Sequence, residues 1–186
     1  MSGILLVADR ADPAGLARAE ASLRDQGFRR SSLLTRGTQA VQAWTPASSA
    51  VGAQLIESRL GSACCVGPLW YRGKFGTAAL SAIVDEIAAA EDRTEHGLDE
   101  HQLRGSFALF VQARGRSWLL NDPLGLVHVY RSEDARIHCT SWLATRAYVG
   151  DASIDEAAAV EYVLLGASHS NQTVAKGVGR IGLGEF

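Results

Sequence analysis

The sequence predicts one layered α+β domain. Its elements come in separate runs: a strand, a helix, a group of strands, a second helix, a meander of strands and a last helix. Such segregation favours antiparallel sheets covered by helices over a doubly wound parallel sheet. The composition agrees, because 186 residues with 47% hydrophobic and 20% charged residues suit a globular domain with a core of ordinary size.

The first half of the chain predicts two helices separated by short strands. A continuous apolar run over residues 4–8 is typical of a strand that is buried on both faces. A helix is expected over 12–27, which begins with an Asp-Pro pair and ends at a glycine. Turn residues interrupt β-branched and small apolar residues over 31–70, which predicts several short strands. Apolar residues at helical spacing predict a second helix over 76–92.

The second half predicts a meander of strands followed by a last helix. Turn residues such as Arg114-Gly115 separate four apolar runs, which is the pattern of antiparallel strands joined in hairpins. The last helix is expected over Ile154–Leu165, after a capping serine and before Gly166. The strands are expected at residues 107–111, 117–121, 127–130 and 136–140.

Charge and composition exclude several classes of partner. The net charge of −2 comes without a basic stripe interleaved with aromatic residues, so nucleic acid is not expected as a partner. No apolar run reaches the roughly 18 residues of a membrane span, and no basic stretch leads into a signal-peptide core. We therefore expect a cytoplasmic protein that has no membrane partner.

The histidines and cysteines predict neither a metal site nor a disulfide framework. His96 and His101 lie in a charged, solvated connection, and His128 and His138 are expected to be cross-strand neighbours. No ligand spacing typical of zinc occurs, so neither a metal nor another cofactor is expected. The cysteines are an odd number and are expected to be small buried apolar residues: Cys64, Cys65 and Cys139.

Two segments of the second half carry a family resemblance. LRGSFALFV (103–111) and NDPLGLVHVY (121–130) have the order and spacing of the motifs L-x-G-x-F-A-F-A-L and R-D-x-x-G-x-x-P-L-Y-Y, with matches at Asp122, Gly125 and Tyr130. The region thus resembles the N-terminal domain of the asparagine synthetase family, the class II glutamine amidotransferases. The segment TVAKGVGRIGLG (173–184) follows the family's closing motif more loosely. The resemblance implies a four-layer αββα sandwich of the N-terminal-nucleophile (Ntn) hydrolase type, with two antiparallel sheets flanked by helices.

The resemblance gives Ser2 a candidate role as a nucleophile. The family begins Met-Cys-Gly-Ile and this chain begins Met-Ser-Gly-Ile, so Ser2 stands where the family's glutaminase cysteine stands. After removal of the initiator methionine, the α-amine of Ser2, with an ordinary pKa of about 7.7–8.0, could act as the base. A hydroxyl depends wholly on that base, whereas a thiol is intrinsically the better nucleophile.

The residues expected to hold glutamine depart from the family pattern. The family uses an Arg-Gly-Pro-Asp motif, and Arg36 and Gly37 in TRGTQ lack the proline and the aspartate. The family's oxyanion donor is the asparagine of an Asn-Gly pair, and here Val66 precedes Gly67. Loss of one such donor commonly costs about 100- to 1,000-fold in rate. No counterpart of the family's Gly-Ser-Asp occurs over 91–100, so Arg36 and Gly67 are expected to belong to a degenerate pocket.

These observations leave three functional hypotheses. The first is a catalytically degenerate glutaminase-like domain with a structural or interaction role in an asparagine synthetase-like, ATP-dependent amide ligase. The alternatives are an Ntn amidohydrolase that uses Ser2 on a substrate other than glutamine, and an unrelated small α+β binding module. Whether the chain is an enzyme is left open, although it is not expected to act as a glutaminase by itself.

The resemblance also implies a partner. Residues 1–186 are expected to form a single glutaminase-like domain, and the Ser-Gly-Gly-x-Asp-Ser loop of an ATP-pyrophosphatase synthetase domain does not occur in them. The expected partner is therefore such a synthetase domain, on the same gene or on a partner chain. Association into a homodimer is left open.

Overall fold

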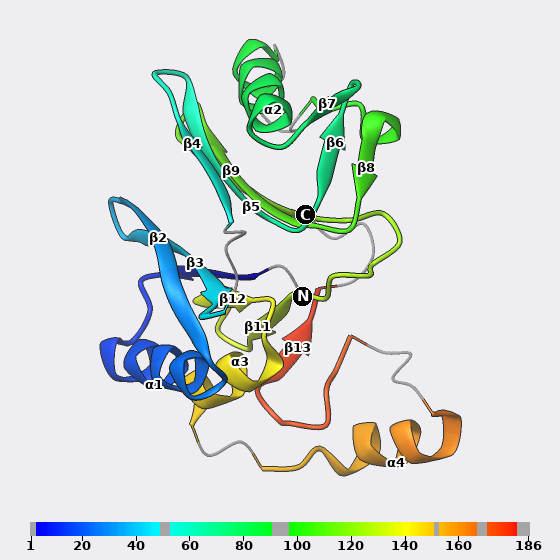
Figure 1. Cartoon of the computed structure of the whole chain (residues 1–186). Helices are drawn as coiled ribbons and strands as arrows, with labels where there is room; N and C mark the ends of the chain where they lie inside the picture. Colours follow the sequence, from blue (N-terminus) through cyan, green and yellow to red (C-terminus); the bar gives the residue numbers. More distant parts are fainter. Residues whose placement is uncertain (1–2, 49–52, 91–96, 151–152, 167–170, 182–186) are drawn as a thin grey trace.

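A computed structural model describes residues 3–48, 53–90, 97–150, 153–166 and 171–181. This part of the chain forms a mixed α/β structure with three antiparallel sheets of six, four and three strands. The sequence predicted two antiparallel sheets, and the third, small sheet β7-β6-β8 is an addition that it did not predict. Figure 1 shows α1 and α3 beside the six-stranded sheet and α2 beside the four-stranded sheet.

The strands and helices have the following bounds. The six-stranded sheet has the order β13-β11-β12-β1-β3-β2 and consists of β1 Ile4–Asp9, β2 Phe28–Arg36, β3 Gln39–Pro46, β11 Tyr130–Ser132, β12 Ile137–Cys139 and β13 Val178–Arg180. The four-stranded sheet has the order β10-β9-β5-β4 and consists of β4 Gln54–Glu57, β5 Gly61–Val66, β9 Ala108–Ala113 and β10 Arg116–Asn121. The remaining elements are β6 Leu69–Tyr71, β7 Lys74–Phe75, β8 Leu103–Gly105, α1 Pro13–Asp25, α2 Thr77–Ala89, a short 3-10 helix Glu100–Gln102, α3 Trp142–Val149 and α4 Glu156–Leu165.

The first strand is buried on both faces, as its continuous apolar run predicted. Ile4 and Leu6 face a cluster that contains side chains of α1 and α3, whereas Leu5 and Val7 face a cluster that contains side chains of the four-stranded sheet. Successive residues of a strand point to opposite faces, so a strand between two apolar layers needs apolar residues at every position. Strand β1 is therefore covered on one side by helices and on the other by a sheet.

Three buried clusters hold the elements together. The first lies between the six-stranded sheet and α1 with α3, and includes Trp44 and Tyr148. The second joins the six-stranded to the four-stranded sheet, and includes Val41 and Phe110. The third lies between the four-stranded sheet and α2, and includes Ile83. Burial of these apolar side chains is the main source of stability for such a packing.

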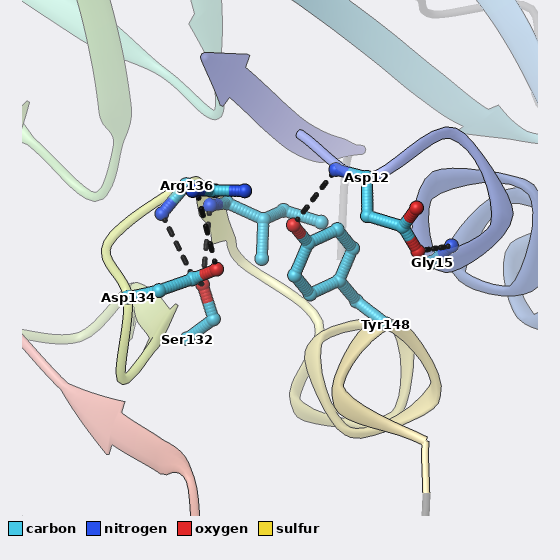
Figure 2. Close-up of polar contacts among 7 residues, drawn as sticks. Asp12, Gly15, Ser132, Asp134, Arg136 and Tyr148 are labelled. Atoms are coloured by element: carbon cyan, nitrogen blue, oxygen red, sulfur yellow. Dashed lines mark hydrogen bonds and ion pairs between the residues drawn. The ribbon is translucent and has the colours of Figure 1, made fainter. Parts of the chain in front are cut away.

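Helix α1 begins where the sequence predicted, because Asp12 caps it. The Asp12 carboxylate accepts a hydrogen bond from the Gly15 N–H at 2.7 Å, and the Asp12 N–H donates to the Tyr148 hydroxyl of α3 at 3.1 Å (Figure 2). A Cβ on Gly15 would lie only 2.9 Å from the Tyr148 ring. The absence of a side chain at Gly15 therefore lets α1 and α3 pack in direct contact.

The predicted strand over 127–130 is displaced, and β11 covers Tyr130–Ser132 instead. The N–H groups of Leu126 and Val127 both donate to the Asp122 carboxylate, at 2.9 and 2.8 Å. Because these donors are used in a turn, they do not pair with a neighbouring strand. The other strands of the meander lie within one or two residues of their predicted bounds.

Besides strands of the small third sheet, the sequence interpretation missed α3 and β13. Helix α3 follows β12 directly, and the Ser141 hydroxyl caps it by accepting from the Ala144 N–H at 3.3 Å. Strand β13 pairs with β11 and completes the edge of the six-stranded sheet. Helix α4 was predicted, but it begins at Glu156 because Asp155 is its cap, and it ends at left-handed Gly166 as expected.

The expected pairing of His128 with His138 is wrong. Strand β11 begins two residues after His128, and Arg131 lies opposite His138 in the ladder. The two histidines line separate cavities. Burial lowers the pKa of His138, and the positive charge of Arg131 lowers it further.

The three cysteines are buried, which confirms that they are buried apolar residues, and the structure has no disulfide among them. Burial raises the pKa of Cys64 and of Cys139 to about 12. Burial also raises the pKa of Cys65, and the neighbouring Cys64 adds to this rise. A thiol reacts as its thiolate, so these residues are expected to be inert in the folded protein.

A thiol-labelling experiment tests this expectation. At pH 8 a soluble disulfide reagent is expected to label Cys64, Cys65 and Cys139 at least about 100-fold more slowly in the native protein than in urea-unfolded protein. The labelling is followed by absorbance and by intact mass. Equal rates in the two states would contradict the burial of the three thiols.

No helix in the ranges that the structure describes is both long enough and apolar enough to cross a membrane.

Candidate functional site

A cavity of about 420 Å³ lies where the first strand begins. Gly3 lines it from the six-stranded sheet side, and Val66 with Gly67 line it from the end of β5 in the four-stranded sheet. Both sheets thus contribute to the lining, and we call this space the Gly3 cavity. Its lining residues are Gly3, Val66, Gly67, Pro68, Ser106, Leu126, Val127, His128, Tyr130 and Thr140.

Two glycines lie where the segment after β5 approaches the segment before β9, and one of them, Gly67, lines the cavity. Gly67 has a φ of +93°, and a Cβ there would overlap the carbonyl oxygen of Ser106. Gly105 has a φ of +122°, and a Cβ there would overlap the carbonyl oxygen of Pro68. Both positions combine a backbone conformation that L-residues rarely adopt with a close approach of two main chains. Glycine at position 67 is therefore required by the geometry of this wall.

The loop over 122–127 forms a second wall and is held by one buried carboxylate. Asp122 is 1% exposed, and its two carboxylate oxygens accept the N–H groups of Leu126 and Val127. Its own N–H donates to the Phe107 carbonyl at 3.0 Å, and its carbonyl accepts from the Gly125 N–H at 2.8 Å. Three of these hydrogen bonds lie within the loop and one ties it to Phe107, just before β9, so Leu126 and Val127 are held in a defined position at the cavity.

The cavity's polar groups come from segments that are distant in sequence. Thr140 bonds to the first strand twice: its Oγ1 accepts from the Leu5 N–H at 3.1 Å, and its own N–H donates to the Leu5 carbonyl at 3.0 Å. Tyr130 lies on β11 with its ring edge against His128, with 6.2 Å between ring centroids. Burial raises the pKa of Tyr130 while the charge of Arg180 opposes the rise, so the phenol is protonated at neutral pH. Ser106, Tyr130 and Thr140 are therefore the hydroxyl-bearing residues of the lining, and the Thr140 hydroxyl already accepts the Leu5 N–H.

The cavity's described lining carries no formal charge from a carboxylate, an ammonium or a guanidinium. None of the lining residues is Asp, Glu, Lys or Arg. The Arg180 side chain is close enough to Tyr130 to influence its pKa, but Arg180 is not among the lining residues. A ligand carboxylate or ammonium would therefore find no Asp, Glu, Lys or Arg partner among the described lining residues.

The structure brings together only some of the residues that the sequence singled out. Gly67 and Tyr130 line the Gly3 cavity, and Asp122 lies in the loop that supports one wall of the cavity. Ser2 lies outside the described residues, next to Gly3, which lines the cavity. His96 lies outside the described residues as well.

Arg36 lies at the opposite end of the six-stranded sheet and does not share the cavity with Gly67. It pairs with Gln39, which pairs in turn with Asp9 at the far end of β1. Asp9 lies six positions after Gly3 along extended strand, which corresponds to roughly 20 Å. The physical reason is the tight turn after Arg36, which returns the chain at once into β3 and leaves the Arg36 side chain exposed.

Ser106 and Thr140 were not predicted as site residues. Thr140 reaches the cavity through its pairing with Leu5, which lies 135 residues earlier in the chain. Ser106 reaches it because Gly105 and Gly67 let the chain approach β5 closely. Neither residue stands in a motif of its own, so the only available indication was the position of Ser106 inside the block over 103–111.

A larger cavity of about 680 Å³ lies elsewhere, at the edge that β13 forms. It is lined by charges of both signs, which include Arg131, Glu133, Asp155 and Lys176. It shares no described lining residue with the Gly3 cavity and holds none of the site residues predicted from the sequence. The smaller cavity is therefore the better candidate site, because it lies at the start of β1.

Comparison with known proteins identifies a related fold. The chain matches no family model and no curated protein sequence. It is similar in structure to a glutamine phosphoribosylpyrophosphate (PRPP) amidotransferase from B. subtilis, solved in complex with ADP and GMP. The fold resembles that of an Ntn glutamine amidotransferase. The match has a TM-score of 0.51 at 10% sequence identity and covers 79% of this chain but only 43% of the other, so it concerns less than half of that protein.

Proposed function

We propose that this chain is a catalytically degenerate glutaminase-like domain of an asparagine synthetase-like, ATP-dependent amide ligase, with a structural or interaction role. The observation that carries the proposal is the Gly3 cavity, whose described lining contains no Asp, Glu, Lys or Arg side chain to hold the ammonium and carboxylate of free glutamine. The similarity to a glutamine amidotransferase fold supports the proposal that the domain is glutaminase-like. The position of Arg36, at the end of β1 that is far from the cavity, supports the proposal that the pocket is catalytically degenerate.

The proposal includes a four-layer αββα arrangement. It is supported by the three buried clusters, which succeed one another from α1 with α3, through the two larger sheets, to α2. The packing of two antiparallel sheets on each other gives no support to the third hypothesis, that of an unrelated binding module. The asparagine synthetase relationship rests on the blocks over 103–111 and 121–130, which contribute Ser106, Asp122 and Tyr130 to the cavity or its support.

An interaction role is supported by α4. This helix buries only Ala158, whereas Val160, Val163 and Leu164 are 56%, 80% and 74% exposed. A helix that is apolar on most sides is normally covered by other protein. We propose that the partner is a synthetase domain on the same gene or on a partner chain. A homodimer would cover the same helix, and the mass of the protein in solution distinguishes the two.

Glutaminase assays of three proteins test the proposal. Wild type, Ser2→Ala and Ser2→Cys are incubated with L-glutamine and the released ammonia is measured, together with the intact mass that reports removal of Met1. We expect no ammonia above background from any of them. The cysteine variant is the sharper test, because it restores the better nucleophile and would rescue activity if only that atom had been lost. Ammonia release that disappears in Ser2→Ala would overturn the proposal.

A second candidate function is an Ntn amidohydrolase that acts on another amide. The observation that favours it is the persistence of a cavity beside Gly3, with three hydroxyl groups and His128 in its lining. This function requires a mature N-terminus at Ser2 and covalent labelling of Ser2 by an acylating reagent. Retention of Met1 in the purified protein would exclude it.

A further inference from the structure

The Gly3 cavity has the chemistry of a binding site for a neutral ligand. Its apolar lining residues are Val66, Pro68, Leu126 and Val127, and its hydroxyl groups come from Ser106, Tyr130 and Thr140. An apolar wall with a few converging hydrogen-bonding groups is the usual composition of a small-molecule site, and about 420 Å³ lies in the usual size range.

The free energy of desolvation decides which ligand this lining accepts. Free glutamine carries an ammonium and a carboxylate, and transfer of unpaired charges out of water costs far more than transfer of an amide group. A neutral amide needs only hydrogen bonds to its carbonyl oxygen and N–H groups, and hydroxyl groups can both donate and accept. The Tyr130 phenol is protonated at neutral pH, as any phenol with an ordinary pKa of about 10 is, and burial only raises that pKa further, so it can donate. The lining thus distinguishes ligands by charge.

The apolar part of the site is held in place before any ligand arrives. Leu126 and Val127 are fixed by their N–H bonds to the buried Asp122 carboxylate. Leu126 lines the cavity and the residue as a whole is 64% exposed, so a ligand can cover part of its side chain. A site that is already ordered loses little conformational entropy on binding.

We infer that the Gly3 cavity binds neutral amides with an apolar substituent, and that it rejects free glutamine. The inference rests on the proposed function, because it takes this cavity to be what remains of a glutaminase pocket. It goes further in naming the class of ligand: an uncharged acyl amide whose apolar group contacts Val127 and Leu126 and whose amide group bonds to the hydroxyl groups.

Two leucines of one loop provide a matched test. Leu126 lines the cavity, whereas Leu124 is 75% exposed on the same loop and does not line it. The wild type, Leu126→Asp and Leu124→Asp proteins are titrated with N-acetyl-L-leucinamide, and with L-glutamine over the same concentrations. Binding is followed by the amide NMR shifts of Gly67, Val127, His128 and Tyr130. Both substitutions add one carboxylate at an exposed position, so they differ mainly in access to the cavity.

We expect saturable shifts with N-acetyl-L-leucinamide and none with L-glutamine. Leu126→Asp is expected to weaken binding about tenfold, because it removes apolar contact area and adds an unpaired charge, whereas Leu124→Asp is expected to change it by about twofold at most. No saturable shift with the neutral amide, tighter binding of L-glutamine, or equal effects of the two substitutions would each overturn the inference. Failure of the neutral amide to bind leaves the proposed function standing, since only Ser2-dependent ammonia release contradicts that function.

Discussion

Gly67→Ala is expected to lower the free energy of unfolding by about 3 kcal/mol or more, because two costs add at this position. The φ of +93° is unfavourable for any residue with a Cβ, and the new methyl group would overlap the Ser106 carbonyl oxygen. Relief of that overlap would require β5 and the segment before β9 to separate. A typical domain has only about 5–15 kcal/mol of stability, so the loss is a large fraction of the total.

A second glycine isolates the contribution of the overlap. Gly73 has a φ of +73°, and a Cβ there would meet no heavy atom within 4 Å. Gly73→Ala should therefore cost only the backbone term of about 1–2 kcal/mol. Urea denaturation of both variants, followed by circular dichroism, measures the difference. Identical midpoints for Gly67→Ala and Gly73→Ala would show that the close approach of the two main-chain segments at Gly67 and Ser106 is not rigid.

Local patterns in the sequence were sufficient to predict several of the buried elements. The uninterrupted apolar run over 4–8 predicted a strand covered on both faces, and alternate residues of β1 do face different clusters. The turn at Arg114-Gly115 was predicted from residue type, and both residues have positive φ angles there. Helix α3 was missed because its capping Ser141 follows the β12 strand so closely that the segment over 136–140 obscured the start of a helix.

The cavity was harder to predict because its walls meet only through tertiary pairing. Gly67 was identified from a motif resemblance, and the structure gives the physical reason for a glycine there, which is the approach of Ser106. Arg36 was assigned to the same pocket from a partial motif, although the turn that follows it carries the side chain to the other end of β1. The placement of Thr140 at the cavity depends on the register between β12 and β1, which no local pattern encodes.

The Asp122 carboxylate provides the second large effect, because it is the buried support of the cavity loop. Asp122→Ala would leave the N–H groups of Leu126 and Val127 without their acceptor. Hydrogen bonds to a charged group contribute about 1.5–3 kcal/mol each, and these donors are partly buried, so we expect a loss of about 3 kcal/mol. Asp122→Asn keeps one acceptor oxygen and should lose about half as much.

Asp134 is the matched control, since it also closes a turn through hydrogen bonds but lies at the surface. Its Oδ1 accepts from the Ser132 hydroxyl at 2.5 Å and from the Arg136 N–H at 3.2 Å, and its side chain is 48% exposed (Figure 2). Water can replace these bonds, so Asp134→Ala should cost about 1 kcal/mol or less. Denaturant midpoints compare the two variants, and equal losses would contradict the structural role of Asp122.

Asp122→Ala should also weaken amide binding in the cavity and Asp134→Ala should not, because the Asp122 carboxylate orders Leu126 and Val127.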